Sequence, residues 1–201
     1  MGLFEPIQSD GVPRRAFLIM PFAFAGLMAL GAKRERVLPD AAQDGNGSEV
    51  TIVLFTDDGE KKSKLKVKKV VMTDAEWRKI LDADEFEVTR KAGTERSYTG
   101  RYWKNHEDGL YRCICCGNAL FSSKTKFESG TGWPSFWAPI AEENIRTVTD
   151  RSLAYEARTE VLCRKCDGHL GHVFNDGPQP TGLRYCMNSV SLKFIKHNAA
   201  G

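Results

Sequence analysis

Two short stretches, Cys113-Ile114-Cys115-Cys116-Gly117 and Cys163-Arg164-Lys165-Cys166-Asp167-Gly168, hold five of the six cysteines in this sequence. Each contains a pair of thiols separated by two residues, so that one tight turn presents both sulfurs to a single ion. Gly117 follows the first pair, where a sharp turn needs a backbone that glycine adopts without steric strain. Two such turns predict a closed tetrahedral site, and four thiolates suit Zn²⁺. The expected ligands are Cys113, Cys116, Cys163 and Cys166.

A closed site with four protein ligands leaves no open position, so we expect the zinc to be structural and not catalytic. If the protein is exported, as its N-terminal residues indicate below, the alternative is a pair of disulfides, because compartments outside the cytoplasm oxidise thiols. Loading of the metal in the reducing cytoplasm, before export of the folded chain, would favour zinc over disulfides.

Length and composition limit the classes of protein to consider. The chain has 201 residues, enough for one ordinary domain with appendages and too few for a large barrel or a dinucleotide-binding architecture. Hydrophobic residues make up 41%, and 29 Lys and Arg against 26 Asp and Glu give a net charge of +3. This composition is globular, and it disfavours disorder and nucleic-acid binding. We expect a monomer.

The N-terminal sequence is typical of an export signal. Residues 14–32 begin with Arg14-Arg15 and continue as an uncharged stretch of about 17 residues, roughly 25 Å as a helix and short for a bilayer core. The pattern Arg-Arg-x-Phe-Leu resembles the bacterial twin-arginine signal. We therefore expect a signal segment over 1–32 and a linker over 33–49, with the protein periplasmic or extracytoplasmic. An uncleaved signal that anchors the protein in a membrane is the alternative.

The remaining chain predicts a mainly β protein. Residues 50–71 form a β-hairpin extension around the turn residues Asp57, Asp58 and Gly59. Thr73 or Asp74 then caps a helix that runs to about Asp82, with Trp77, Ile80 and Leu81 on one face. The main domain covers 72–197, and 198–201 is a tail.

Cys186 is the candidate nucleophile. It lies in Arg184-Tyr185-Cys186-Met187-Asn188, and along an unbroken strand Arg184, Cys186 and Asn188 project to one face. A guanidinium beside the thiol favours the thiolate, and the Asn188 amide can bind a polar substrate. An inert cysteine in a half-buried strand is the alternative reading of this segment.

Two histidines and an aromatic loop supply further candidates. His169 and His172 can transfer protons near neutral pH, although a zinc-ligand or a purely hydrogen-bonding role also fits them. The loop from Gly130 to Trp137 crowds Trp133 and Phe136 around a proline. Such a cluster can line a pocket for a methyl or thioether group, or it can belong to the core.

Four segments together resemble the type B methionine sulfoxide reductases, which reduce methionine-R-sulfoxide. The resemblance covers about Met72 to Phe194, and its landmarks are VTRKAGTERSYTGRYW (88–103), YRCICCGNALFSSKTKFESGTGWPSFW (111–137), GHLGHVFNDGP (168–178) and TGLRYCMNSVSLKF (181–194). It implies a mainly β fold of two antiparallel sheets with a few short N-terminal helices. It also implies structural zinc on the two cysteine pairs.

The resemblance further implies roles for individual residues. Cys186 is the nucleophile, and Trp133 lines the pocket for the substrate methyl group, with Phe136 beside it. The residues that bind or polarise the sulfoxide oxygen are then His169, His172, Asn188, Asp176 and Arg184. The substrate is methionine-R-sulfoxide in proteins or free, and the activity is the repair of oxidised proteins under oxidative stress.

Attack would leave Cys186 as a sulfenic acid, which a second thiol must reduce. Many family members carry a resolving cysteine where this chain has Thr131. We therefore expect an external thiol or a thioredoxin-like protein as reductant, with Cys115 as the alternative resolving thiol. A zinc-stabilised binding module without catalysis is the alternative function.

Overall fold

A computed structural model describes residues 47–150 and 158–197. The expected signal segment over 1–32, most of the linker over 33–49 and the tail over 198–201 lie outside these residues. In the described part of the chain, no helix is both long and apolar enough to cross a membrane.

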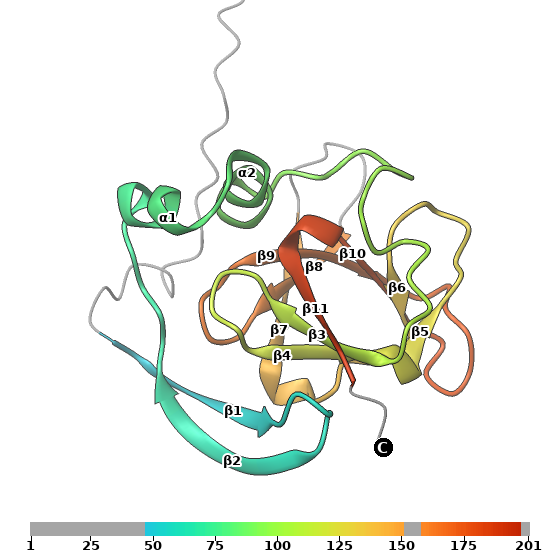
Figure 1. The fold of residues 1–201 in the computed structure, drawn as a ribbon, viewed down its shortest axis with the longest axis horizontal. Helices are drawn as coiled ribbons and strands as arrows, with labels where there is room; N and C mark the ends of the chain where they lie inside the picture. The colour runs from blue at the N-terminus through green and yellow to red at the C-terminus, as the bar shows by residue number, and fades with distance from the viewer. Residues whose placement is uncertain (1–46, 151–157, 198–201) are drawn as a thin grey trace, which may run out of the picture. The chain divides into compact units, whose positions relative to one another are not determined.

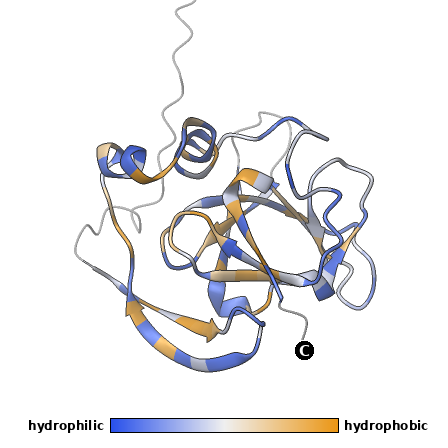
Figure 2. Cartoon of the chain, in the orientation of Figure 1, coloured by the Kyte–Doolittle hydropathy of each residue, from blue (hydrophilic) through white to orange (hydrophobic). Residues whose placement is uncertain are grey.

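The predicted hairpin is present as β1 (Glu49–Phe55) and β2 (Lys61–Lys68), a separate antiparallel two-stranded sheet (Figure 1). The side-chain amide of Asn144 fixes β1 to the main domain, since its Oδ1 accepts from Val53 N at 2.7 Å and its Nδ2 donates to Val53 O at 2.8 Å. Asn144 is fully buried. β2 is the outer strand and is largely hydrophilic (Figure 2). The hairpin thus packs on the domain along the edge of β1.

Two short helices follow the hairpin, α1 (Asp74–Ile80) and α2 (Ala83–Lys91). Thr73 caps α1 as predicted, with Glu76 completing a capping box. α1 ends at Ile80, close to the expected end near residue 82. Asp82 and Glu85 form a second capping box that starts α2, a helix not predicted from the sequence. Trp77 and Leu81 are buried, whereas Ile80 is 57% exposed and does not belong to the expected apolar face.

The main domain contains two antiparallel sheets, as the sequence predicts. The six-stranded sheet has the order β5-β6-β10-β9-β8-β7. Its strands are β5 (Lys126–Phe127), β6 (Ser135–Phe136), β7 (Ile145–Asp150), β8 (Arg158–Cys163), β9 (His169–Phe174) and β10 (Arg184–Met187).

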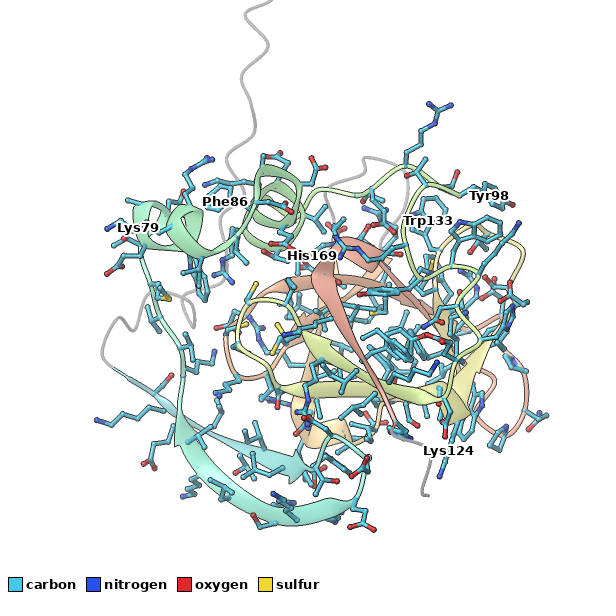
Figure 3. The ribbon with its side chains drawn as sticks, viewed as in Figure 1. Lys79, Phe86, Tyr98, Lys124, Trp133 and His169 are labelled. Atoms are coloured by element: carbon cyan, nitrogen blue, oxygen red, sulfur yellow. The ribbon has the colours of Figure 1, made fainter. Side chains whose placement is uncertain are left out.

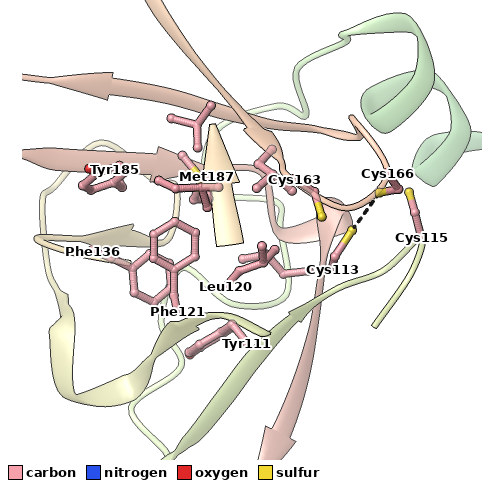
Figure 4. Close-up of a cluster of buried hydrophobic side chains, with 14 of the residues drawn as sticks. Tyr111, Cys113, Cys115, Leu120, Phe121, Phe136, Cys163, Cys166, Tyr185 and Met187 are labelled. Carbon is pink, nitrogen blue, oxygen red and sulfur yellow. Dashed lines mark hydrogen bonds between the residues drawn. The ribbon is translucent and has the colours of Figure 1, made fainter. Parts of the chain in front are cut away.

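The three-stranded sheet has the order β11-β3-β4, with β3 (Gly109–Cys113), β4 (Ala119–Ser122) and β11 (Leu192–Lys196). Three 3-10 turns, η2 (Ser123–Thr125), η3 (Glu142–Asn144) and η4 (Ser189–Ser191), connect strands. Side chains from both sheets share one core, in which Phe121 of β4 stacks on Phe136 of β6 at 4.5 Å (Figure 4).

Candidate active site and metal centre

The two cysteine turns lie at the ends of two hairpins, one from each sheet of the main domain. Cys113 ends β3 and the turn to β4 carries Cys116, while Cys163 ends β8 and the turn to β9 carries Cys166. Gly117 has a φ of 71°, the left-handed conformation expected after the first pair. One ion held by both turns would therefore join the two sheets.

The four sulfurs have the spacing of a metal site. All four Sγ atoms lie within 4.8 Å of one another, and Cys113–Cys166 and Cys116–Cys163 are each separated by 3.6 Å. Tetrahedral zinc with Zn–S bonds of about 2.3 Å places its sulfurs about 3.8 Å apart. All six cysteines are free and no pair is at bonding distance, so this arrangement favours a metal site over two disulfides. The donor set fits a thiolate-bound metal.

Neighbouring groups support the cysteine turns. Asn118 Nδ2 lies 3.7 Å from Cys163 Sγ, and Arg90 of α2 donates to the carbonyl of Cys166 at 2.9 Å. Cys115 is buried beside Cys166 at this end of the core (Figure 4). Its thiol contacts Cys113, Cys166 and Thr89. These are not the neighbours of Cys186.

Cys186 lies on β10 in the middle of a polar row across the six-stranded sheet. It is paired in register with Ser135 of β6 on one side and His172 of β9 on the other, and His172 is paired with Glu160 of β8. Directly opposed residues in antiparallel strands present their side chains on the same face. The thiol and an imidazole are therefore cross-strand neighbours.

The pKa of Cys186 is raised above its ordinary value, and burial is the main cause. Contacts with Thr131, Arg184 and Ser135 act in the opposite direction but do not outweigh burial. The sequence predicts a thiolate favoured by Arg184. Arg184 acts in that direction, but the net shift is the reverse, because sequence spacing does not reveal the desolvation of the sulfur.

Each histidine is held by a carboxylate. His169 Nδ1 lies 2.7 Å from Glu160 Oε1, and His172 Nε2 lies 3.0 Å from Asp150 Oδ2, with the two rings 5.4 Å apart. Burial lowers the pKa of His172, against the hydrogen bond with Asp150. His169 Nε2 is buried and has no hydrogen-bond partner within residues 47–150 and 158–197. Neither histidine is among the clustered metal ligands of the described chain.

Arg184 and Asp176 form a bidentate ion pair, with both N···O distances 2.8 Å. This hydrogen bonding raises the pKa of Arg184 and lowers that of Asp176. The guanidinium also covers the ring of Phe174, 4.4 Å from its centroid. Arg184 is therefore fixed next to Cys186, and Asp176 reaches the site through Arg184.

The loop from Gly130 to Trp133 borders the thiol. Thr131 Oγ1 lies 3.9 Å from Cys186 Sγ. Tyr98 holds both neighbours of Thr131, because its hydroxyl donates to Gly130 O at 2.5 Å and its backbone N–H donates to Gly132 O at 2.9 Å. Trp133 Nε1 donates to the carbonyl of Glu95 at 3.1 Å. In Figure 3, Trp133 lies between His169 and Tyr98.

Two predicted substrate-binding residues are placed differently from the prediction. Asn188 does not continue the exposed face of β10, because the strand ends at Met187. Its buried amide accepts from Glu95 N at 3.0 Å and donates to Leu170 O at 3.2 Å, which ties the loop between α2 and β3 to β9. Phe136 is fully buried in the aromatic core, so the core reading of this residue is correct.

Several residues of the site are missed by sequence reasoning. Glu160 and Asp150 hold the histidines, yet their positions in β8 and β7 carry no signal of that role. Tyr98 and Glu95 lie more than 30 residues from Trp133 in the sequence, and only folding brings them together. One missed feature outside the site does have a local sequence signal. Asp82 and Glu85 have the spacing of a capping box, which starts α2.

A half-buried thiol, two carboxylate-held histidines and four clustered cysteines that could hold a metal ion, on two antiparallel sheets, define a thiol-based oxidoreductase. Residues 81–196 match the model of the SelR domain, more than half of the chain. The chain belongs to the SelR family. It is similar to two enzymes named peptide methionine sulfoxide reductase MsrB. The enzyme from Herminiimonas arsenicoxydans is 56% identical over 126 residues, 63% of this chain and 91% of the relative.

The second enzyme named peptide methionine sulfoxide reductase MsrB, from Hahella chejuensis (strain KCTC 2396), is 56% identical over 133 residues, 66% of this chain and 94% of the relative. A third relative, peptide methionine sulfoxide reductase B1, chloroplastic, from Oryza sativa subsp. japonica, is 56% identical over 125 residues, 62% of this chain and 58% of the relative. All three matches are shorter than the 201-residue chain, and the family match begins after the β1–β2 hairpin.

Proposed function

We propose that this protein reduces methionine-R-sulfoxide, in proteins or free, to methionine, with Cys186 as the nucleophile. The observation that carries the proposal is the cross-strand pair of Cys186 and His172, in a chain of the SelR family. The names of the similar enzymes support the substrate class. They give no support to the alternative of a zinc-stabilised binding module without catalysis.

The first stage reduces the sulfoxide and oxidises Cys186. Cys186 Sγ attacks the sulfoxide sulfur and forms an S–S bond, and the protonated substrate oxygen leaves as water. Attack of water on Cys186 Sγ then cleaves the S–S bond and gives methionine and a sulfenic acid on Cys186. The substrate sulfur gains two electrons and Cys186 loses two. Because oxide is a poor leaving group, the substrate oxygen must accept a proton or a strong hydrogen bond.

The two histidines can supply that proton or hydrogen bond. His172 is the cross-strand neighbour of the thiol, and burial, which lowers its pKa, favours the neutral ring that can accept the thiol proton. His169 keeps one ring nitrogen buried and unpartnered among the described residues, while Glu160 holds the other. An unpartnered buried nitrogen is unfavourable unless a ligand completes its hydrogen bonding. We assign that ligand as the substrate oxygen.

An external thiol completes the cycle. Two thiols reduce the sulfenic acid to the Cys186 thiol, release water and become a disulfide. Thr131 occupies the position beside Cys186 where many family members have a resolving cysteine, and a hydroxyl cannot form a disulfide. The contacts of Cys115 are with the metal cysteines and not with the neighbours of Cys186. We therefore favour a small thiol or a thioredoxin-like protein over Cys115.

We propose Zn²⁺ as the metal, held by the four clustered cysteines. In this position the ion would cross-link the two sheets and would take no part in the reduction of the substrate. Metal analysis of the purified protein tests the identity of the ion.

The assay that tests the function uses the R and S epimers of N-acetyl-methionine sulfoxide with dithiothreitol. We expect turnover of the R epimer alone, and loss of turnover in Cys186→Ser. Cys115→Ser is the matched control and should retain activity. Activity that survives in Cys186→Ser, or turnover of the S epimer instead, contradicts the proposal.

We also propose that the protein is exported by the twin-arginine route, on the basis of the pattern at Arg14, Arg15, Phe17 and Leu18. Cell fractionation of the full chain and of the variant with both arginines changed to lysine tests this. Retention of the variant in the cytoplasm is expected. Equal export of both proteins contradicts the proposal.

A further inference from the structure

The loop between α2 and β3 forms one side of the candidate active site. Tyr98 holds the residues on both sides of Thr131, and Thr131 contacts Cys186. The carbonyl of Glu95 accepts the indole N–H of Trp133. The chain that continues from Glu95 through Tyr98 to Lys104 therefore lies at the border of the site.

After Glu95, the charged residues of this border up to Lys104 are all positive. Arg96, Arg101 and Lys104, which we call the cationic rim, are exposed, and residues 96–106 contain no acidic residue. None of the three has an ion-pair partner within the part of the chain that the structure describes.

Two carboxylates that neighbour this loop have other partners. The carboxylate of Glu95 is used internally, because it accepts from the backbone N–H groups of Ser189 and Val190 at 2.7 and 3.0 Å. Glu128 is paired with Lys126 at 3.4 Å and with His106 at 3.5 Å.

Aromatic rings hold two of the cations in place. Lys104 Nζ lies 4.4 Å from the centroid of the Trp103 ring, and the Arg101 guanidinium lies 5.8 Å from that of Tyr102. Trp103 in turn packs edge-on against Tyr98 at 5.2 Å. Tyr98 itself is 54% exposed. Side chains ordered before binding lose less conformational entropy when a ligand arrives.

We propose that the cationic rim selects oxidised methionines that lie in acidic segments of protein substrates. The inference rests on the proposed function, since it concerns the residues that flank the oxidised methionine. Unpaired cations at the border of the site attract carboxylates on either side of that methionine, and the exposed Tyr98 offers a ring for the peptide backbone to pack against. A free amino acid derivative has no flanking residues and would not use the rim.

The experiment compares two peptides with one methionine-R-sulfoxide each, flanked either by Asp and Glu or by Asn and Gln. Dithiothreitol is the reductant, so that docking of a reductant protein plays no part. For the wild type we expect kcat/KM to be about tenfold higher for the acidic peptide at low salt, and the preference to shrink at high salt.

The test variant is Arg96→Glu/Arg101→Glu/Lys104→Glu, which should lose or reverse this preference. It should turn over N-acetyl-methionine-R-sulfoxide like the wild type. The matched control is Lys61→Glu/Lys62→Glu/Lys66→Glu, which makes the same change of net charge on the exposed strand β2. The control variant should keep the preference for the acidic peptide.

Equal kcat/KM for the two peptides in the wild type overturns the proposal. The same loss in the control variant also overturns it, because net charge and not the rim would then be responsible. A charge preference that appears only with a protein reductant assigns the rim to the reductant and contradicts the proposal. Failure of the wild type to reduce N-acetyl-methionine-R-sulfoxide would instead contradict the proposed function. This result is distinct from the loss of a charge preference, which concerns the rim alone.

Discussion

The hydroxyl oxygen of Thr131 lies 3.9 Å from the sulfur of Cys186. This contact lowers the pKa of the thiol, whereas burial raises it by more. Removal of the hydroxyl should therefore make the thiolate still less accessible. Substitution of Thr131 therefore tests directly how this contact affects the reactivity of the Cys186 thiol.

Thr131→Val keeps the shape of the side chain and removes the hydroxyl. We expect alkylation of Cys186 by iodoacetamide at about pH 8 to slow by roughly two- to tenfold, the effect of one hydrogen bond. Thr149→Val, on an exposed position of β7, should leave the rate unchanged. Faster alkylation in Thr131→Val would show that the hydroxyl does not stabilise the thiolate.

Gly132→Ala should displace the loop that carries Thr131. Gly132 has a φ of 86°, and a Cβ atom there would lie 2.7 Å from the backbone nitrogen of Tyr98. We expect at least a tenfold loss of kcat/KM, because a shift of about 1 Å at a catalytic contact has effects of this size or larger. Gly182→Ala has a similar φ of 70° but meets no atom within 4 Å, so it controls for backbone strain alone. Equal activity of the two variants would contradict a role of this loop in placing Thr131 beside Cys186.

Cys116→Ser should remove the bound metal and destabilise the fold. Structural zinc contributes about 10–16 kcal/mol of apparent binding free energy in small peptides, so loss of a ligand should lower the melting temperature strongly. Cys115→Ser, one residue away, should retain one zinc per chain by elemental analysis. Metal loss in Cys115→Ser, or full metal content in Cys116→Ser, would show that the ligand set is wrong.

Asn144→Ala tests how the hairpin is held. The substitution leaves the N–H and C=O of Val53 and the C=O of Ala119 without the partner that Asn144 provides. Each buried group that loses its partner costs about 1–3 kcal/mol, so we expect the free energy of unfolding to fall by several kcal/mol. Hydrogen exchange should increase first in β1. Unchanged protection of β1 would contradict this role of Asn144.

His172 should make stability depend on pH. Burial lowers its pKa in the folded protein, so the unfolded chain takes up a proton more readily. The free energy of unfolding should therefore fall as pH drops below about 6.5, the ordinary histidine value, and level off below the folded pKa. This dependence should be weaker in His172→Gln and unchanged in His106→Gln, whose side chain is 71% exposed. The same dependence in both variants would assign it to another group.

The sequence predicts local features well where a few neighbouring residues specify them. The cysteine pairs show their spacing, and Thr73 with Glu76 shows a capping box. The alternating residues of 50–71 indicate a hairpin. Each depends on contacts within one turn or one pair of strands, and each is present.

Features that depend on distant segments are not predictable in this way. The end of β10 at Met187 moves Asn188 off the face of Cys186, and Phe136 is buried because Tyr111 and Phe121 from the other sheet pack against it. The raised pKa of Cys186 follows from desolvation by the whole fold. The sequence shows the charged neighbour Arg184 but not this burial.

Mass spectrometry of a single turnover tests the central claim most directly. The protein is mixed with N-acetyl-methionine-R-sulfoxide without a reductant, trapped with a reagent specific for sulfenic acids, and digested. We predict one adduct of the trapping reagent per chain, located on Cys186, and none with the S epimer. An adduct on any other residue, or a disulfide between Cys186 and one of the four clustered cysteines, would contradict the account.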